Sequence, residues 1–132
     1  MHATSRVDTL IRSLALTPHP EGGFYREVFR SAGNVAPADG RPPRQALTAI
    51  YFLLATGQHS CWHRVASDET WTHLEGDPLE LLCFDSARLS RARLGTAGPG
   101  VVPLLAVPAG VWQAARPLGA YALVACRLLA RR

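Results

Sequence analysis

The sequence predicts an all-β protein, a sandwich or barrel with one short helix near its N-terminus, in a single domain of residues 1–132. Most of the chain consists of short apolar or alternating runs separated by turn residues, as in antiparallel sandwiches and barrels. The first apolar residues instead recur at a helical spacing. A length of 132 residues suits one domain, and 48% hydrophobic with 18% charged residues is a globular composition.

The elements follow in order along the chain. Residues 7–16 predict a packing helix, with Ser5 as its cap and Pro18 just beyond its end. The stretch 32–43, rich in Ala, Gly and Pro, predicts a loop, and Gly-Asp-Pro at 76–78 predicts a turn. Strands are expected at 24–29, 47–55, 60–66, 70–74, 79–85, 87–94, 101–107, 111–115 and 120–129.

The charge pattern argues against a nucleic-acid partner. The net charge is +4 and the pI about 9.5, but the cationic residues are all Arg and form small, separate groups. They are not interleaved with stacking aromatic residues, as single-strand binders require. No apolar run approaches the roughly 20 residues that span a bilayer, and the first residues lack a secretion signal pattern. We therefore expect no membrane partner and a cytoplasmic location.

The sequence GQHSCWHRVASDETWTHLEG places a His and a Glu on two neighbouring expected strands. Because side chains alternate along a strand, His63 would share its face with Cys61, and Glu69 its face with Trp71 and His73. His73 cannot join Glu69 on one metal ion. The two residues stand about 13 Å apart along an extended strand at about 3.3 Å per residue, whereas metal ligands lie within about 2.0 to 2.3 Å of the ion.

These segments resemble the motifs of the cupin superfamily. The first cupin motif has a Gly, a His-x-His pair, a Glu and a closing Gly, at a spacing that this chain reproduces with Gly57, His63, Glu69 and Gly76. Val65 stands in place of the second His, and in PAGVWQ, similar to the second motif Pro-x-Gly-x-x-His, Gln113 stands in place of the His. HPEGGFYRE, AIYFLL, HRVASDETW, GDPLEL and VPAGVWQAA resemble, in order, the fifth cupin family, a domain of unknown function, over about residues 7–127.

The resemblance implies an RmlC-like jelly roll, a double-stranded antiparallel β-helix with a central pocket. It also implies a homodimer in which the chains pair through their sheets. Two of the four usual metal ligands are replaced, so we expect no cofactor. The alternative is a divalent transition metal held by His63, Glu69 and Gln113, in a metal-dependent dioxygenase.

The expected pocket residues favour acid/base chemistry. An imidazole held by a carboxylate can take a proton from carbon, so we expect His63 as general base and Glu69 as its orienting or second carboxylate. Gln113 can donate a hydrogen bond to an oxygen where charge develops. This chemistry suits an isomerase, epimerase, lyase or cyclase acting on an oxygen-rich metabolite, such as a sugar derivative or natural-product intermediate. The expected substrate-binding residues are Tyr25, Glu27, Cys61, Trp71, His73 and Trp112.

Two other interpretations stay open. A non-catalytic module could hold a small metabolite between Trp71 and Trp112, and His63 and Glu69 could simply satisfy each other as a buried pair. In HPEGGFYRE, the paired glycines allow backbone angles or close approaches that other residues cannot adopt. Glu21 is expected to help close this turn.

Overall fold

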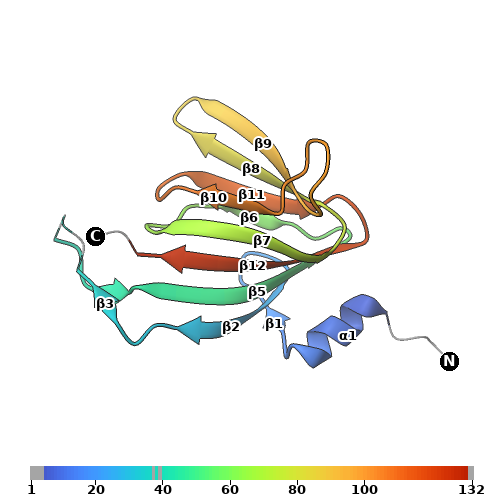
Figure 1. Ribbon diagram of the computed structural model, residues 1–132, viewed down its shortest axis with the longest axis horizontal. Helices are drawn as coiled ribbons and strands as arrows, with labels where there is room; N and C mark the ends of the chain where they lie inside the picture. The colour runs from blue at the N-terminus through green and yellow to red at the C-terminus, as the bar shows by residue number, and fades with distance from the viewer. Residues whose placement is uncertain (1–4, 37, 39, 131–132) are drawn as a thin grey trace.

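The computed structural model describes residues 5–36, 38 and 40–130. Two antiparallel sheets face each other around an apolar core, which is the expected jelly-roll arrangement (Figure 1). The elements are α1 (Arg6–Ser13), β1 (Thr17–Pro18), β2 (Phe24–Arg30), β3 (Asn34–Val35), β4 (Arg44–Gln45), β5 (Leu47–Ala55), β6 (Ser60–His63), β7 (Asp68–Gly76), β8 (Leu79–Asp85), β9 (Arg88–Leu94), β10 (Leu104–Val107), β11 (Trp112–Pro117) and β12 (Tyr121–Leu129).

The strand order explains how distant motifs meet. The larger sheet has the order β1-β2-β5-β12-β7-β10, and the smaller has the order β6-β11-β8-β9. The segment that carries His63 and Glu69 therefore crosses from one sheet to the other, because β6 belongs to the smaller sheet and β7 to the larger. The two side chains approach the space between the sheets from opposite walls.

Strand β5 is apolar on both faces because both faces are covered. Phe52 and Leu54 point into the core between the sheets, whereas Leu53 packs on the outer side with Leu10 of α1. All three strand residues are almost fully buried. A strand buried on both faces gives a continuous apolar run rather than an alternating pattern, as the sequence shows here.

Helix α1 is held at its start by polar contacts. The Ser5 hydroxyl accepts a hydrogen bond from the backbone N–H of Asp8, which confirms the expected cap. Arg6 donates from Nε and Nη2 to the two carboxylate oxygens of Glu75, each at 2.7 Å, and Tyr121 also donates to this carboxylate. The Arg6 guanidinium and the Tyr121 hydroxyl hold the pKa of Glu75 at about 2.

Most predicted elements are confirmed, with differences at their ends. The strands expected at 47–55 and 79–85 have the predicted bounds, but the strand expected at 60–66 ends at His63. The expected loop 32–43 contains β3, which pairs with β4 in a two-stranded ladder. Two-residue strands carry too little periodicity to be recognised in a sequence.

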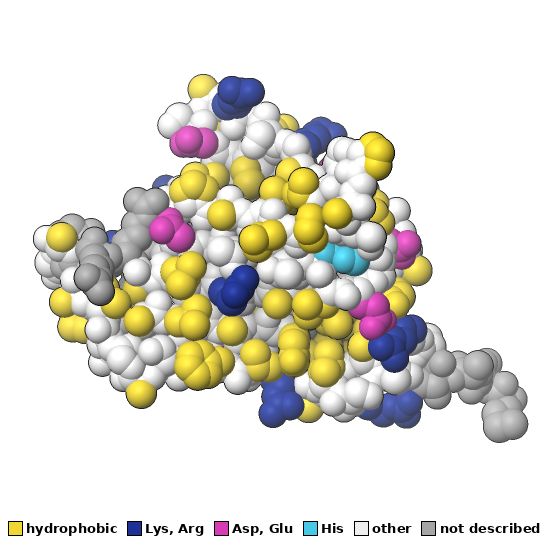
Figure 2. All heavy atoms as spheres, in the orientation of Figure 1, with side chains coloured by type: hydrophobic (Ala, Val, Ile, Leu, Met, Phe, Trp, Pro, Cys, Tyr) yellow, Lys and Arg dark blue, Asp and Glu magenta, His cyan; other side chains and the backbone are white. Residues whose placement is uncertain are grey.

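The homodimer expected from the resemblance stays a prediction. Figure 2 shows hydrophobic side chains gathered over β5 and β12, on the outer face of the larger sheet, with few charged groups among them. Apolar patches of this kind are common at protein interfaces. Among the residues described, no helix has the length and apolar character needed to cross a membrane.

Candidate functional site

A small cavity lies between the two sheets, with about 250 Å³ of empty space including its open mouth. About 30 Å³ of this is open to the centres of water molecules, so the cavity admits a group of a few heavy atoms. Its walls are formed by His19, Glu21, Ile50, Phe52, Ser60, His63, Glu69, Trp71 and Cys126. The expected pair His63 and Glu69 therefore shares one cavity, and Trp71 stands beside it.

Glu69 is a buried carboxyl group, with 7% of its surface exposed. Gln113 donates from Nε2 to Glu69 Oε1 at 2.6 Å, and Trp71 donates from its indole N–H to Gln113 Oε1 at 2.9 Å. Burial raises the pKa of Glu69, although the hydrogen bond from Gln113 and the charge of His63 act in the opposite direction. The site therefore favours a protonated Glu69, which can donate a proton.

The pKa of Glu69 gives a stability prediction. Because the pKa is higher in the folded protein, folding favours the protonated acid, and stability falls as pH rises from 4.5, the ordinary value, to the folded value. We expect the free energy of unfolding of Glu69→Gln to match that of the wild type near pH 4 and to exceed it near pH 8. The expected excess is about 1.4 kcal/mol for each unit by which folding raises the pKa of Glu69. Urea unfolding at both pH values measures this difference. If the difference in free energy of unfolding between Glu69→Gln and the wild type were the same at pH 4 and pH 8, the pKa of Glu69 would not be raised by folding.

His63 is held through one ring nitrogen. Its Nδ1 lies 2.8 Å from the backbone carbonyl oxygen of Cys61 and 3.4 Å from Oε2 of Glu21. A carbonyl oxygen only accepts hydrogen bonds, so Nδ1 carries the proton and Nε2 of the neutral ring keeps its lone pair. The carboxylate that orients His63 is therefore Glu21, whereas the sequence suggested Glu69 for this role.

Strand β6 contains a bulge that changes which side chains enter the cavity. Against β11, His63 pairs with Gln113 but Ser60 pairs with Ala115, so three steps along β6 match two along β11. Ser60 and His63 both line the cavity as a result, although they stand an odd number of residues apart. Cys61 is exposed and lines a hollow on the outer face instead. The structure thus corrects the expectation that Cys61 faces the pocket.

The HPEGG segment closes one wall of the cavity. The backbone N–H of Glu21 donates to His19 Nδ1 at 3.0 Å, and the N–H of Cys61 donates to the carbonyl oxygen of Glu21 at 2.9 Å. Gly22, with φ of +112°, lies so close to the segment just before β6 that a Cβ there would overlap the carbonyl oxygen of His59. These contacts place Glu21 beside His63.

Sequence reasoning missed His19 and Glu21 as pocket residues. The paired glycines were the available signal, because they indicated a close approach of the backbone to another segment. What they approach, the start of β6, could not be read from the pattern. Burial lowers the pKa of His19, so its imidazole stays neutral near physiological pH.

Four other expected site residues do not line the cavity: Trp112, His73, Glu27 and Tyr25. Trp112 precedes the inward-facing Gln113 on β11 and therefore points outward, where it lines a hollow with Trp62, Phe84 and Leu89. The metabolite sandwich expected between Trp71 and Trp112 is not formed, because Trp71 is buried beside the cavity between the sheets and Trp112 lines a separate hollow.

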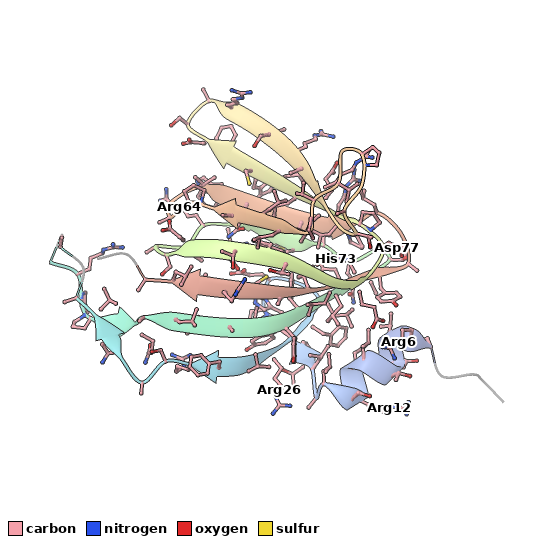
Figure 3. All side chains as sticks on the ribbon, in the orientation of Figure 1. Arg6, Arg12, Arg26, Arg64, His73 and Asp77 are labelled. Atoms are coloured by element: carbon pink, nitrogen blue, oxygen red, sulfur yellow. The ribbon has the colours of Figure 1, made fainter. Side chains whose placement is uncertain are left out.

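His73 stands near the end of β7 and does not line the cavity. Its Nε2 lies 3.2 Å from the carbonyl oxygen of Asp77, and Figure 3 shows the two residues together at that end of the sheet. The ladder with β12 stays in register from Glu69 to His73 and shifts only beyond it. His73 therefore keeps the expected alternation, and it lies outside the cavity because it stands further along the strand, at that end of the sheet.

Glu27 and Tyr25 do not line the cavity, for different reasons. Glu27 accepts two hydrogen bonds from Arg30, at 2.7 and 2.9 Å, in an exposed ion pair. Tyr25 packs against the core and meets the His19 ring edge-on, with 4.7 Å between ring centroids. Tyr25 therefore supports the cavity wall from behind His19.

The donor set does not fit the alternative metal centre. The side-chain oxygen of Gln113 already accepts from Trp71, and its nitrogen donates to Glu69. Within the described residues, no three His, Cys, Asp or Glu side chains come together in a geometry that could hold a metal ion. The expectation of no cofactor stays a prediction.

Known proteins place the chain in a family. A family model described as Cupin superfamily (DUF985) matches residues 8–129. A hypothetical protein from Leishmania major is 34% identical over 92% of this chain and 80% of its own, with a TM-score of 0.86. A protein from Shewanella oneidensis is 34% identical over 95% of this chain and 78% of its own, with a TM-score of 0.85.

More distant structures share the fold alone. KdgF from Halomonas sp. is 14% identical, over 89% of this chain and 88% of its own, with a TM-score of 0.60. No curated protein is similar enough to count as a match. The motifs, the jelly roll and the matched length agree, and the chain belongs to the fifth cupin family, the DUF985 branch of the cupin superfamily.

Proposed function

We propose that this cupin is an acid/base enzyme of the isomerase, epimerase or lyase type, acting on a small oxygen-rich metabolite. One observation carries the proposal: an imidazole with a free Nε2 and a carboxyl group with a raised pKa line the same small cavity. An imidazole with an available lone pair beside a carboxyl group that can donate a proton is a usual arrangement for a base and an acid that work together.

The two groups divide the reaction between them. His63 takes a proton from the carbon next to a carbonyl group, and the electron pair of that C–H bond moves toward the carbonyl oxygen. Glu69 donates its proton to this oxygen, giving an enediol, an imidazolium and a carboxylate. If the imidazolium returns its proton to the neighbouring carbon and the Glu69 carboxylate takes the proton of the second hydroxyl group, the product is an isomer. If a water molecule protonates the original carbon from the opposite face, while the Glu69 carboxylate takes back the oxygen-bound proton and the imidazolium gives its proton to the resulting hydroxide, the product is an epimer. Glu21 stabilises the imidazolium through Nδ1.

Gln113 has a supporting role in this proposal. The sequence suggested that its amide donates to the substrate oxygen, but its nitrogen donates to Glu69 and its side chain is fully buried. It fixes the orientation of the acid and links it to Trp71. Gln113 is therefore a positioning residue rather than a group that touches the substrate.

Hydrogen–deuterium exchange tests the proposed reaction before the natural substrate is known. The protein is incubated in D₂O with hydroxyaldehydes and hydroxyketones of three to six carbons, both neutral and carboxylate-bearing, and proton NMR follows the carbon next to the carbonyl. We expect exchange above the buffer rate for at least one compound, because enolisation precedes every product of this class. Exchange at the buffer rate across the whole panel would contradict the proposal.

A further inference from the structure

The cavity contains no fixed positive charge. The chain has no Lys, and none of the Arg side chains described lines the cavity. Arg30 pairs with Glu27 on the surface, and Arg64 lies over the outward-facing Trp112, 5.0 Å from its ring centroid. Figure 3 shows Arg12 and Arg26 on the outer side of the fold, near α1.

The charge inside the cavity is negative or zero. Glu21 lines the cavity, and 42% of its carboxylate side chain is exposed to solvent. Its charge acts on both His19 and Glu69. A carboxylate or phosphate entering the cavity would lose water while facing this charge, without a cation to compensate.

Three hydrogen-bond donors in and beside the cavity are already used. The Trp71 indole N–H donates to Gln113, the Gln113 amide donates to Glu69, and His63 Nδ1 faces the carbonyl oxygen of Cys61. Burial raises the pKa of Glu69 and so favours its protonated form, but the proposed reaction uses that proton on the substrate oxygen. A second neutral donor is needed to hold this oxygen while the proton moves.

His19 supplies that donor through its tautomer. Because Nδ1 accepts the backbone N–H of Glu21, the proton of the neutral ring must be on Nε2. The ring is fixed by edge-on contacts with Tyr25 and with Phe52, whose centroids lie 4.7 and 5.4 Å away. His19 lines the cavity, and no contact of Nε2 with another described residue occupies its N–H.

We propose that His19 donates from Nε2 to the carbonyl oxygen of the substrate, and that the cavity therefore selects an uncharged carbonyl compound over a carboxylate or phosphate. The catalytic part of this inference rests on the acid/base function proposed above, whereas the binding part does not. A neutral imidazole polarises a carbonyl group without attracting an anion, which matches the missing positive charge.

Acetamide and acetate test the selection, because they have nearly the same shape and differ in charge. Each is titrated into ¹⁵N-labelled protein at pH 7.5, and the indole N–H signal of Trp71, which lines the cavity, is followed by NMR. Trp62 and Trp112 lie on the outer face and serve as internal controls. We expect acetamide to shift the Trp71 signal alone, and acetate to bind at least tenfold more weakly.

His19→Asn tests the donor. The Asn side-chain oxygen stands where Nδ1 stood and can still accept the N–H of Glu21, so the loop is kept while the Nε2 donor is removed. We expect acetamide binding to weaken roughly two- to tenfold, the effect of losing one neutral hydrogen bond. His59→Asn, at an exposed position outside the cavity, is the matched control and should bind acetamide as the wild type does.

The outcomes separate the two proposals. Acetate binding as tightly as acetamide, or neither compound reaching Trp71 at 100 mM, would overturn the selection for an uncharged group. Unchanged acetamide binding in His19→Asn would overturn the role of His19. If acetamide binds through His19 but no compound exchanges its proton in D₂O, the binding inference stands and the acid/base function fails.

Discussion

His63→Asn is expected to slow proton exchange at the substrate carbon by about 10²- to 10⁴-fold, the contribution of a positioned general base. The Asn side-chain amide can occupy the place of Nδ1 and donate to the carbonyl oxygen of Cys61, so the bulged strand keeps its polar contact. Only the Nε2 lone pair is removed. The rate of deuterium incorporation in D₂O, measured by NMR on a compound that the wild type exchanges, gives the effect.

The control for this variant is His59→Asn, the same substitution at an exposed histidine outside the cavity. It should exchange the compound at the wild-type rate. Circular dichroism and urea unfolding establish that both variants are folded. If folded His63→Asn protein exchanged the proton as fast as His59→Asn, His63 would not be the base.

Gly22→Ala is expected to destabilise the protein by about 2–4 kcal/mol, the largest stability effect that we predict. A Cβ at this position would overlap the carbonyl oxygen of His59, and φ of +112° is unfavourable for alanine in any case. The overlap involves backbone on both sides, so a side-chain rotation cannot relieve it. Movement of the loop would also carry Glu21 away from His63.

Gly57→Ala separates the two causes of the expected destabilisation, which are the overlap with His59 and the positive φ. Gly57 has φ of +81° but no atom within 4 Å of an added Cβ, so alanine there meets only the unfavourable backbone angle. We expect a cost of about 1–2 kcal/mol for this control. Urea unfolding of both variants measures the difference. Equal costs would show that the close approach of Gly22 to His59 adds nothing to stability.

The sequence predicted the fold because the fold depends on local patterns. Apolar runs between turn residues identified β5 and β8, and the cupin-like spacing placed His63 and Glu69 on two successive strands. The alternation of side chains along a strand predicted that Trp71 lies on the same face as Glu69, and both line the cavity. Each of these features requires only the geometry of one strand and the burial of its apolar face.

Pairing between distant segments decided the rest of the site. The bulge in β6, which turns Cys61 outward and Ser60 inward, exists only in the ladder with β11. His19 and Glu21 reach the cavity because Gly22 allows their loop to pack on the start of β6, about 40 residues further along the chain. The residues that form the expected acid/base pair could therefore be predicted from the sequence. Their orientation and hydrogen-bond partners, and the charge of the cavity, could not, because they depend on contacts between strands that only the folded chain brings together.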